Sequence, residues 1–93
     1  MSITKKQLRE FVNVLKVAAR DEELLEDFLV DITTPAEREA LIQRWQIVKK
    51  LHAGEVQRQI ADELGVGIAT VTRGSRELSS GTGALLKVLK KTN

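Results

Sequence analysis

Apolar residues recur at three- and four-residue spacing along most of this chain, and nowhere do they alternate as they would in a β-strand. The pattern is clearest between residues 8 and 19, where charged side chains fill the opposite face. It returns between residues 24 and 32, between 41 and 51, and between 85 and 89. This periodicity is typical of amphipathic helices. The sequence therefore predicts an all-α fold of about six helices.

Capping residues indicate where the first helices begin and end. Thr4 is suited to cap the first helix. The second helix is expected to begin at Asp21, with Glu22 and Glu23 in its first turn, where the helix dipole favours acidic residues. The segment 34–37, Thr-Pro-Ala-Glu, predicts the start of a third. Its threonine caps, its proline takes the first helical position, and its glutamate returns a hydrogen bond to the capping amide. Gly54 predicts that this third helix ends near residue 52.

Two glycine-containing segments separate the later helices. The segment 64–67, Leu-Gly-Val-Gly, predicts a break between two shorter helices. The segment 79–83, Ser-Ser-Gly-Thr-Gly, is the most loop-like stretch of the chain. A last amphipathic helix is expected after it, because Leu85, Leu86, Val88 and Leu89 have helical spacing and the three lysines among and after them favour a helix C-terminus.

Ninety-three residues with three aromatics and no cysteine leave a thin core for a monomer. A chain of this size buries roughly 60–65% of the surface that it exposes when unfolded. No disulfide is possible, and His52 is the only histidine, so a metal site of cysteine and histidine ligands is excluded as well. We therefore expect one domain, residues 1–93, that gains a larger core by oligomerisation.

Charge is distributed unevenly along the chain. Residues 1–34 carry five Lys and Arg against seven Asp and Glu, whereas residues 35–93 carry ten against six. The basic remainder suits a surface that faces a polyanion, and a solvated surface of uneven charge is the equally compatible alternative. The chain starts without the apolar stretch of a signal peptide and has no apolar run long enough for a membrane span. We expect a cytoplasmic protein with no membrane partner.

Catalytic chemistry has no candidate residues in this sequence. One histidine, no cysteine, no glycine-rich phosphate loop after a strand and no paired carboxylates at acid/base spacing leave nothing to carry a reaction. His52 is better explained by its place near a helix end, where a cation is favourable. An enzyme is therefore excluded, and neither a catalytic residue nor a cofactor is expected.

Residues 57–73 have the layout of a helix-turn-helix. Small Ala61 lets two helices approach, and Gly65 permits the tight turn between them. The second helix presents short side chains and hydroxyls that suit contacts with bases, phosphates or bridging water. An ordinary helical hairpin is the alternative explanation. The expected apolar wedge between the helices consists of Ile60, Leu64, Val66, Ile68 and Val71.

Several segments together resemble the bacterial tryptophan repressor family. They are residues 34–41 (Thr-Pro-Ala-Glu-Arg-Glu-Ala-Leu), Arg44 with Ile47-Val48, Gly54-Glu55, Gln57-Arg58 and, most specifically, residues 67–75 (Gly-Ile-Ala-Thr-Val-Thr-Arg-Gly-Ser). The resemblance implies an intertwined homodimer whose core helices lie in residues 1–53 and 82–93. It also implies a mobile helix-turn-helix, residues 56–78, and L-tryptophan as a corepressor.

The resemblance also implies a ligand site. Arg44 and Arg73 match the arginines that flank the indole ring, and Arg73 also pairs with the ligand carboxylate. Thr34 of the other subunit matches the threonine beside that carboxylate. Two guanidinium groups and a hydroxyl suit an aromatic amino acid, because a guanidinium stacks on a ring and pairs with a carboxylate. The slot would be lined by Ile47, Val48 and Gly74, for which plain core packing is the alternative role.

A second set of positions is implied to contact DNA. Arg58 matches an arginine that contacts guanine directly, although a phosphate contact is a serious alternative for it. The positions that match a water-mediated reading of the major groove are Ile68, Ala69 and Thr72. Those expected to support phosphate contacts are Gln57, Gly67 and Thr70.

Three positions depart from the family pattern. Glu77 stands where the family has a serine that contacts the ligand ammonium, so it either accepts from that ammonium or pairs with Arg73. The Ser or Thr that normally precedes Gln57 is missing, which removes the natural cap of the first helix of the helix-turn-helix. Ser79 replaces a lysine, which predicts weaker and less salt-dependent DNA binding.

These observations favour a sequence-specific transcriptional repressor that binds palindromic, double-stranded operator DNA as a homodimer. An amino-acid corepressor, L-tryptophan first of all, would activate it. One alternative is a helix-turn-helix regulator that needs no ligand. The other is a helical, dimeric protein-interaction module, which accounts for the apolar stripes but not for residues 67–75.

Overall fold

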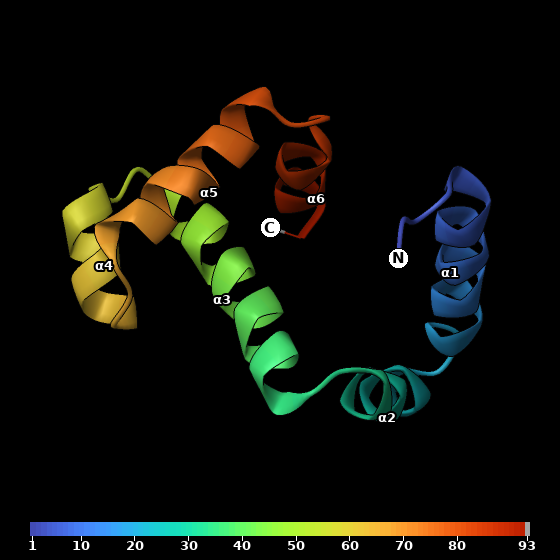
Figure 1. The fold of residues 1–93 in the computed structure, drawn as a ribbon. Coiled ribbons are helices and arrows are strands. Elements are labelled where there is room, and N and C mark those ends of the chain that lie inside the picture. Colours follow the sequence, from blue (N-terminus) through green and yellow to red (C-terminus); the bar gives the residue numbers. More distant parts are fainter. Residues whose placement is uncertain (93) are drawn as a thin grey trace. The chain divides into compact units, whose positions relative to one another are not determined.

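The computed structural model describes residues 1–92, which form six α-helices and no β-strand. Figure 1 shows them in chain order from blue to red. The all-α prediction is confirmed, and no helix within these residues is long and apolar enough to cross a membrane. The helices are α1 (Lys5–Ala18), α2 (Glu22–Ile32), α3 (Pro35–His52), α4 (Gln57–Leu64), α5 (Ile68–Ser80) and α6 (Ala84–Thr92).

Side-chain hydrogen bonds confirm the predicted starts of α1, α2 and α3. The Thr4 hydroxyl accepts from the Gln7 amide at 3.1 Å, and the Gln7 side chain accepts from the Thr4 amide at 3.0 Å. Thr34 and Glu37 repeat this reciprocal arrangement at α3, with distances of 3.2 and 2.8 Å. Asp21 caps α2 by accepting from the second amide of that helix. These caps satisfy donors that a helix start leaves without a partner.

The chain divides into two compact units, Met1–Arg38 and Glu39–Asn93, and each is described separately. In the first unit α1 packs on α2, with the rings of Phe11 and Phe28 centred 6.2 Å apart. Ala18 is the one buried residue between positions 1 and 38. Large apolar side chains therefore remain about half exposed on both helices, namely Leu8, Phe11, Val12, Val17, Leu24, Val30 and Ile32.

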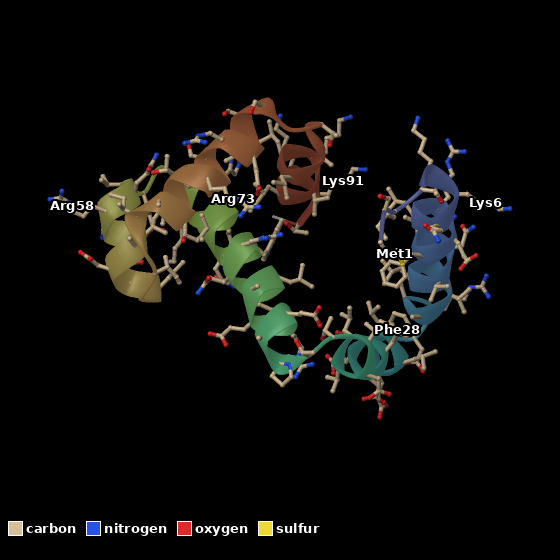
Figure 2. The ribbon with its side chains drawn as sticks, viewed as in Figure 1. Met1, Lys6, Phe28, Arg58, Arg73 and Lys91 are labelled. Atoms are coloured by element: carbon tan, nitrogen blue, oxygen red, sulfur yellow. The ribbon has the colours of Figure 1, made fainter. Side chains whose placement is uncertain are left out.

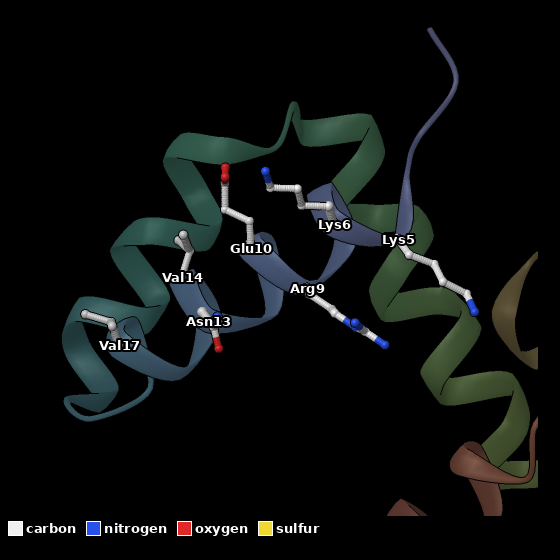
Figure 3. A pocket seen from close by; sticks show the side chains of 7 residues that line it. All are labelled: Lys5, Lys6, Arg9, Glu10, Asn13, Val14 and Val17. Carbon is white, nitrogen blue, oxygen red and sulfur yellow. The ribbon is translucent and has the colours of Figure 1, made fainter.

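Two hollows lie on this first unit. One, of about 270 Å³, is apolar and is lined from both helices, by Val14, Val17 and Ala18 of α1 and by Leu24 and Phe28 of α2. The other, of about 720 Å³, lies along α1 and is drawn in Figure 3. Its lining begins with Lys5, Lys6 and Arg9 and ends with Val17. Because a single helix supplies every side chain of this larger hollow, it is an open groove and not an enclosed site.

The second unit has a small aliphatic core where α3 meets the helix-turn-helix. Ile47, Ile60 and Val71 are at most 1% exposed, and Ala61 is buried beside them. Leu51, Leu64 and Val66 pack around this cluster. At about 25 cal/mol per Å² of buried apolar surface, complete burial of one such aliphatic side chain stabilises the fold by about 1.5–3 kcal/mol. These few residues thus hold α4 and α5 against α3.

Two details of the sequence prediction are wrong. Ile68 was expected in the apolar wedge, but it is 50% exposed, because it is the first residue of α5, and the helix starts beyond the buried cluster that contains Ile60 and Val71. Ser79 and Ser80 were expected in a loop, but they belong to α5. The helix continues until Gly81, whose amide donates to the Glu77 carbonyl at 3.1 Å. The hydroxyls of Ser79 and Ser80 donate to carbonyls one turn earlier, at 3.0 and 2.7 Å, as serine side chains inside a helix can do.

Candidate functional site

The turn between α4 and α5 has the geometry of a helix-turn-helix. Gly65 ends α4 in the left-handed conformation with φ +67°, which glycine adopts without steric cost. The next amide, that of Val66, returns to the carbonyl of Ala61 at 3.0 Å. Ala61 is buried, as expected of the small residue that lets two helices approach. The predicted helix-turn-helix is therefore present at the predicted place.

The start of α5 presents an exposed surface. Ile68, Ala69 and Thr70, all predicted to contact DNA, are exposed on its first turn. Arg58 is exposed as well, and in Figure 2 its side chain extends from α4 into solvent. Gly67 precedes this turn with open space around its α-carbon. These side chains and backbone groups are accessible to a large partner.

Thr72 and Gln57, two further residues predicted to contact DNA, bond to each other. The Thr72 hydroxyl lies 2.8 Å from the side-chain oxygen of Gln57 and 3.0 Å from the carbonyl of Ile68. One hydroxyl proton serves one acceptor well, so the two oxygens compete for it. The bond joins the first residue of α4 to the second turn of α5. It holds the two helices in a defined relation.

Neither helix of the helix-turn-helix has a side-chain cap. Val56 precedes α4 and Gly67 precedes α5, and neither makes a capping hydrogen bond from its side chain. By contrast, side chains cap α1, α2 and α3. The first amides of α4, and those of Ile68 and Ala69 in α5, are therefore free to donate to an external acceptor, whereas the Thr70 amide donates to the Gly67 carbonyl at 3.1 Å. Helix starts also carry partial positive charge.

A lysine connects α3 to α4. The ammonium of Lys50 lies 2.8 Å from the Glu63 carboxylate and 3.6 Å from that of Glu55. The hydrogen bond from Lys50 lowers the pKa of Glu63 below its usual 4.5. The same bond, to Glu63, raises the pKa of Lys50 above its usual 10.5. No local pattern in the sequence indicates the Lys50–Glu63 ion pair, because the two residues lie thirteen positions apart on different helices.

A pocket of about 160 Å³ lies between α3 and α5. It brings together six residues that were predicted to bind ligand, and it adds three that were not. The predicted six are Arg44, Ile47, Val48, Arg73, Gly74 and Glu77, and the additional three are Ala40, Gln43 and Thr70. Ala40 lies four residues before Arg44, and Gln43 lies four residues before Ile47, so their helical spacing from predicted ligand positions was the available signal.

Close packing of the two helices forms the floor of this pocket. Gly74 is buried against Ile47, and a Cβ at position 74 would lie 2.7 Å from the Cγ2 of Ile47. Ile47 and Val48 are 1% and 2% exposed. Ile47 and Val48 therefore have both roles considered for them, because their side chains belong to the core and also line the pocket.

The pocket rim is charged. The Nε of Arg73 donates to the Oε1 of Glu77 at 3.2 Å, one turn further along α5. Figure 2 labels Arg73 on this helix. With Arg44 on the opposite wall, the rim carries two guanidinium groups and one carboxylate. Such a set suits a small ligand that carries both charges.

Comparison with known proteins identifies the family of this chain. The family profile described as Trp repressor protein matches residues 6–93. The chain belongs to the Trp repressor family. This family consists of transcription regulators, which places the chain among regulators and not among enzymes.

Several curated members of the Trp repressor family are similar to this chain. A Trp operon repressor homolog of Vibrio cholerae is 49% identical over 73 residues, which cover 77% of this chain and 70% of that protein. One of Vibrio campbellii is 45% identical over 76 residues, 81% of this chain and 75% of that protein. One of Vibrio vulnificus is 61% identical over 51 residues, about half of either chain.

Thr34 stands apart from the other ligand positions of the Trp repressor pattern. It belongs to the first compact unit, whereas the pocket lies in the second. Its hydroxyl oxygen accepts from the Glu37 amide in the α3 capping box. The hydroxyl proton stays available for a carboxylate, because capping uses only the oxygen lone pair. Capping and ligand binding are thus compatible roles for this threonine.

Proposed function

We propose that this chain is a homodimeric repressor that binds palindromic operator DNA and that L-tryptophan, as corepressor, strengthens this binding. One observation carries the proposal. The helix α5 lines the pocket with Thr70, Arg73 and Gly74, and the same helix exposes Ile68 and Ala69 at its start. A ligand in the pocket therefore touches the helix that would enter the DNA groove.

The exposed surface of the helix-turn-helix supports DNA as the partner. Free amides at the starts of α4 and α5 suit phosphate oxygens, and Gln57, Gly67 and Thr70 lie at or near these starts. Arg58 extends into solvent, where its fork of donors suits guanine or a phosphate. We assign Ile68, Ala69 and Thr72 to the major groove, with water bridging where these short side chains do not reach the bases.

The pocket supports an aromatic amino acid as the corepressor. Its floor is aliphatic, from Ile47 and Val48, which suits an indole ring. Arg44 and Arg73 provide flat cationic groups that stack on an aromatic face. No cofactor and no metal is needed for this binding. At about 160 Å³ the pocket in one chain is smaller than usual ligand pockets of about 300–1,000 Å³.

A second copy of the chain would complete both the pocket and the core. In the first unit Leu8, Phe11 and Leu24 are 56%, 40% and 50% exposed, so a large apolar surface is in contact with solvent. An interlocked partner would bury these side chains. It would also bring its own Thr34 to the ligand carboxylate, so each ligand site would be shared by two subunits.

The proposed mechanism is thermodynamic linkage. L-tryptophan increases DNA affinity only if it binds the DNA-competent orientation of α5 more tightly than the others. By the same linkage, operator DNA must tighten L-tryptophan binding by an equal factor, typically 5- to 150-fold. The protein would act in the cytoplasm, where its DNA and its amino acid meet.

Calorimetry of the full chain tests this proposal. A palindromic duplex is first selected from a random-sequence pool with the purified protein. L-tryptophan is then titrated into the protein with and without this duplex. We expect saturable binding in both arms and tighter binding in the presence of DNA. Sedimentation velocity in the same buffer checks that the protein is a dimer.

Each alternative predicts a different result. A regulator that needs no ligand would select a duplex but give no heat with L-tryptophan in either arm. A protein-interaction module would select no duplex at all, although it would still sediment as a dimer. Equal tryptophan affinity with and without DNA would refute the linkage.

A further inference from the structure

Glu77 is locally unfavourable for the helix on which it lies. It occupies the last turn of α5, Ile68–Ser80, where the helix dipole disfavours a negative charge. Its ion pair with Arg73 runs in the weaker order, with the cation four residues before the anion. Both side chains are well exposed, at 67% for Arg73 and 43% for Glu77, so the pair adds little to stability. Helix stability therefore does not explain this carboxylate.

The contact within the pair uses one donor of Arg73 and one oxygen of Glu77, and it leaves the remaining groups of these two pocket-lining residues available. Arg73 uses its Nε for Glu77, and the two terminal nitrogens of its guanidinium keep their donors. Glu77 uses Oε1, and its Oε2 has no hydrogen-bond partner among residues 1–92. The pair is thus a preformed unit with free donors at one end and a free anionic acceptor at the other.

We infer that Glu77 makes the pocket selective for a free amino acid, a ligand with both a carboxylate and a protonated amine. This inference rests on the proposed function and specifies which ligands the same site accepts. The carboxylate of such a ligand meets Arg73, with Arg44 close by, while its ammonium meets the free oxygen of Glu77. Both contacts are charge-assisted hydrogen bonds, the stronger kind.

A ligand without the amine fits this pocket poorly for two reasons. Its carboxylate is attracted by the two arginines but repelled by Glu77, which lies on the same rim. The rim carboxylate also loses water on ligand binding without gaining a partner, and such unpaired groups are costly. Glu77 therefore acts as a specificity residue that rejects deaminated acids.

Three indole compounds separate the contribution of the ligand carboxylate from that of the ligand ammonium. L-tryptophan carries both charges, indole-3-propionate lacks the amine, and tryptamine lacks the carboxylate. Each is titrated calorimetrically into the full-length protein, into Glu77→Gln and into Asp62→Asn. The last variant removes a carboxylate from α4, outside the pocket, and thus controls for the change in net charge. Circular dichroism verifies that each variant keeps its helix content.

We expect the unmodified protein to bind L-tryptophan at least tenfold more tightly than indole-3-propionate. Glu77→Gln should reduce this preference to about threefold or less, by weakening L-tryptophan and strengthening indole-3-propionate. Asp62→Asn should leave the preference unchanged. Tryptamine should bind most weakly throughout, because it cannot pair with the arginines.

Three outcomes would overturn the inference. Equal affinity of the unmodified protein for L-tryptophan and indole-3-propionate would show that Glu77 does not select. An equal loss of affinity for L-tryptophan and indole-3-propionate in Glu77→Gln would show that Glu77 has only a structural role. Tighter binding of both ligands in that variant would mean that Glu77 merely occupies Arg73. Failure of the unmodified protein to bind any of the three would instead refute the proposed corepressor site.

Discussion

Replacing Gly74 by alanine measures how closely α5 packs against α3. The new Cβ would lie 2.7 Å from the Cγ2 of Ile47. Nonbonded carbons prefer about 3.5–4.0 Å, so the two helices must separate by about 1 Å. Ile47 is 1% exposed, and its Cγ2 is attached directly to Cβ, so no flexible chain end moves aside.

Two opposing effects determine the magnitude. Overpacking a close contact costs about 1–3 kcal/mol, whereas alanine is favoured over glycine inside a helix by about 1 kcal/mol. We therefore expect Gly74→Ala to lower the free energy of unfolding by up to about 2 kcal/mol. Since Gly74 and Ile47 also line the pocket, L-tryptophan affinity should fall as well.

Two backgrounds at position 47 make the explanation testable. Ile47→Val keeps the methyl branch that would meet the new Cβ, and Ile47→Leu removes that branch at similar volume. Gly74→Ala should remain destabilising in the valine background and become neutral or stabilising in the leucine background. Urea unfolding followed by circular dichroism, at one fixed protomer concentration, gives all the free energies.

The sign of the change decides the outcome. A stabilising effect of Gly74→Ala in the unmodified protein would mean that α5 does not pack on Ile47 as closely as described. The same loss of stability in the valine and leucine backgrounds would show that the Cγ2 contact is not the cause.

Three further predictions concern the helix-turn-helix and its surroundings. Val56→Ser supplies the missing cap of α4 and should raise the free energy of unfolding by about 0.5–1 kcal/mol in urea titrations, and no gain would mean that α4 begins elsewhere. Because Lys50 lowers the pKa of Glu63, the pair stabilises the fold above pH 4.5, and this contribution is lost as the pH falls through the lowered value. Lys50→Met should flatten the pH–stability curve below pH 4.5, and an unchanged curve would show that the Lys50–Glu63 ion pair does not stabilise the fold. Arg73→Ala should abolish tryptophan binding, whereas Arg58→Ala should spare it and reduce operator discrimination by about 1–3 kcal/mol in competition binding, and the reverse pattern would exchange their assigned roles.

Local signals were predicted well from the sequence. The capping residues Thr4 and Thr34 act within three residues of their partners, so sequence order alone brings donor and acceptor together. Gly65 is equally local, because its left-handed conformation belongs to one turn. The missing cap before α4 was also predictable, since Val56 has no side-chain acceptor.

Predictions that depended on orientation were less accurate. Ile68 fits the helical spacing of the apolar wedge, yet it is half exposed, because the start of α5 projects beyond the core. Ser79 and Ser80 have the composition of a loop, yet both belong to α5, and their hydroxyls donate to carbonyls one turn earlier. Spacing predicted that Ile68 is buried, and composition predicted that Ser79 and Ser80 form a loop. The position of each residue in the folded chain decided otherwise.

The sequence by itself determined the helical class, the helix starts and the order of elements, because periodicity and capping act over a few residues. It also carried the family pattern that singled out Arg44, Arg73 and Glu77. Only the tertiary structure decided that these three line one pocket, and that Arg73 is already paired with Glu77. Residues on α3 and α5 are about thirty positions apart, and the burial of Ile47 against Gly74 and in one cluster with Val71 brings their helices together.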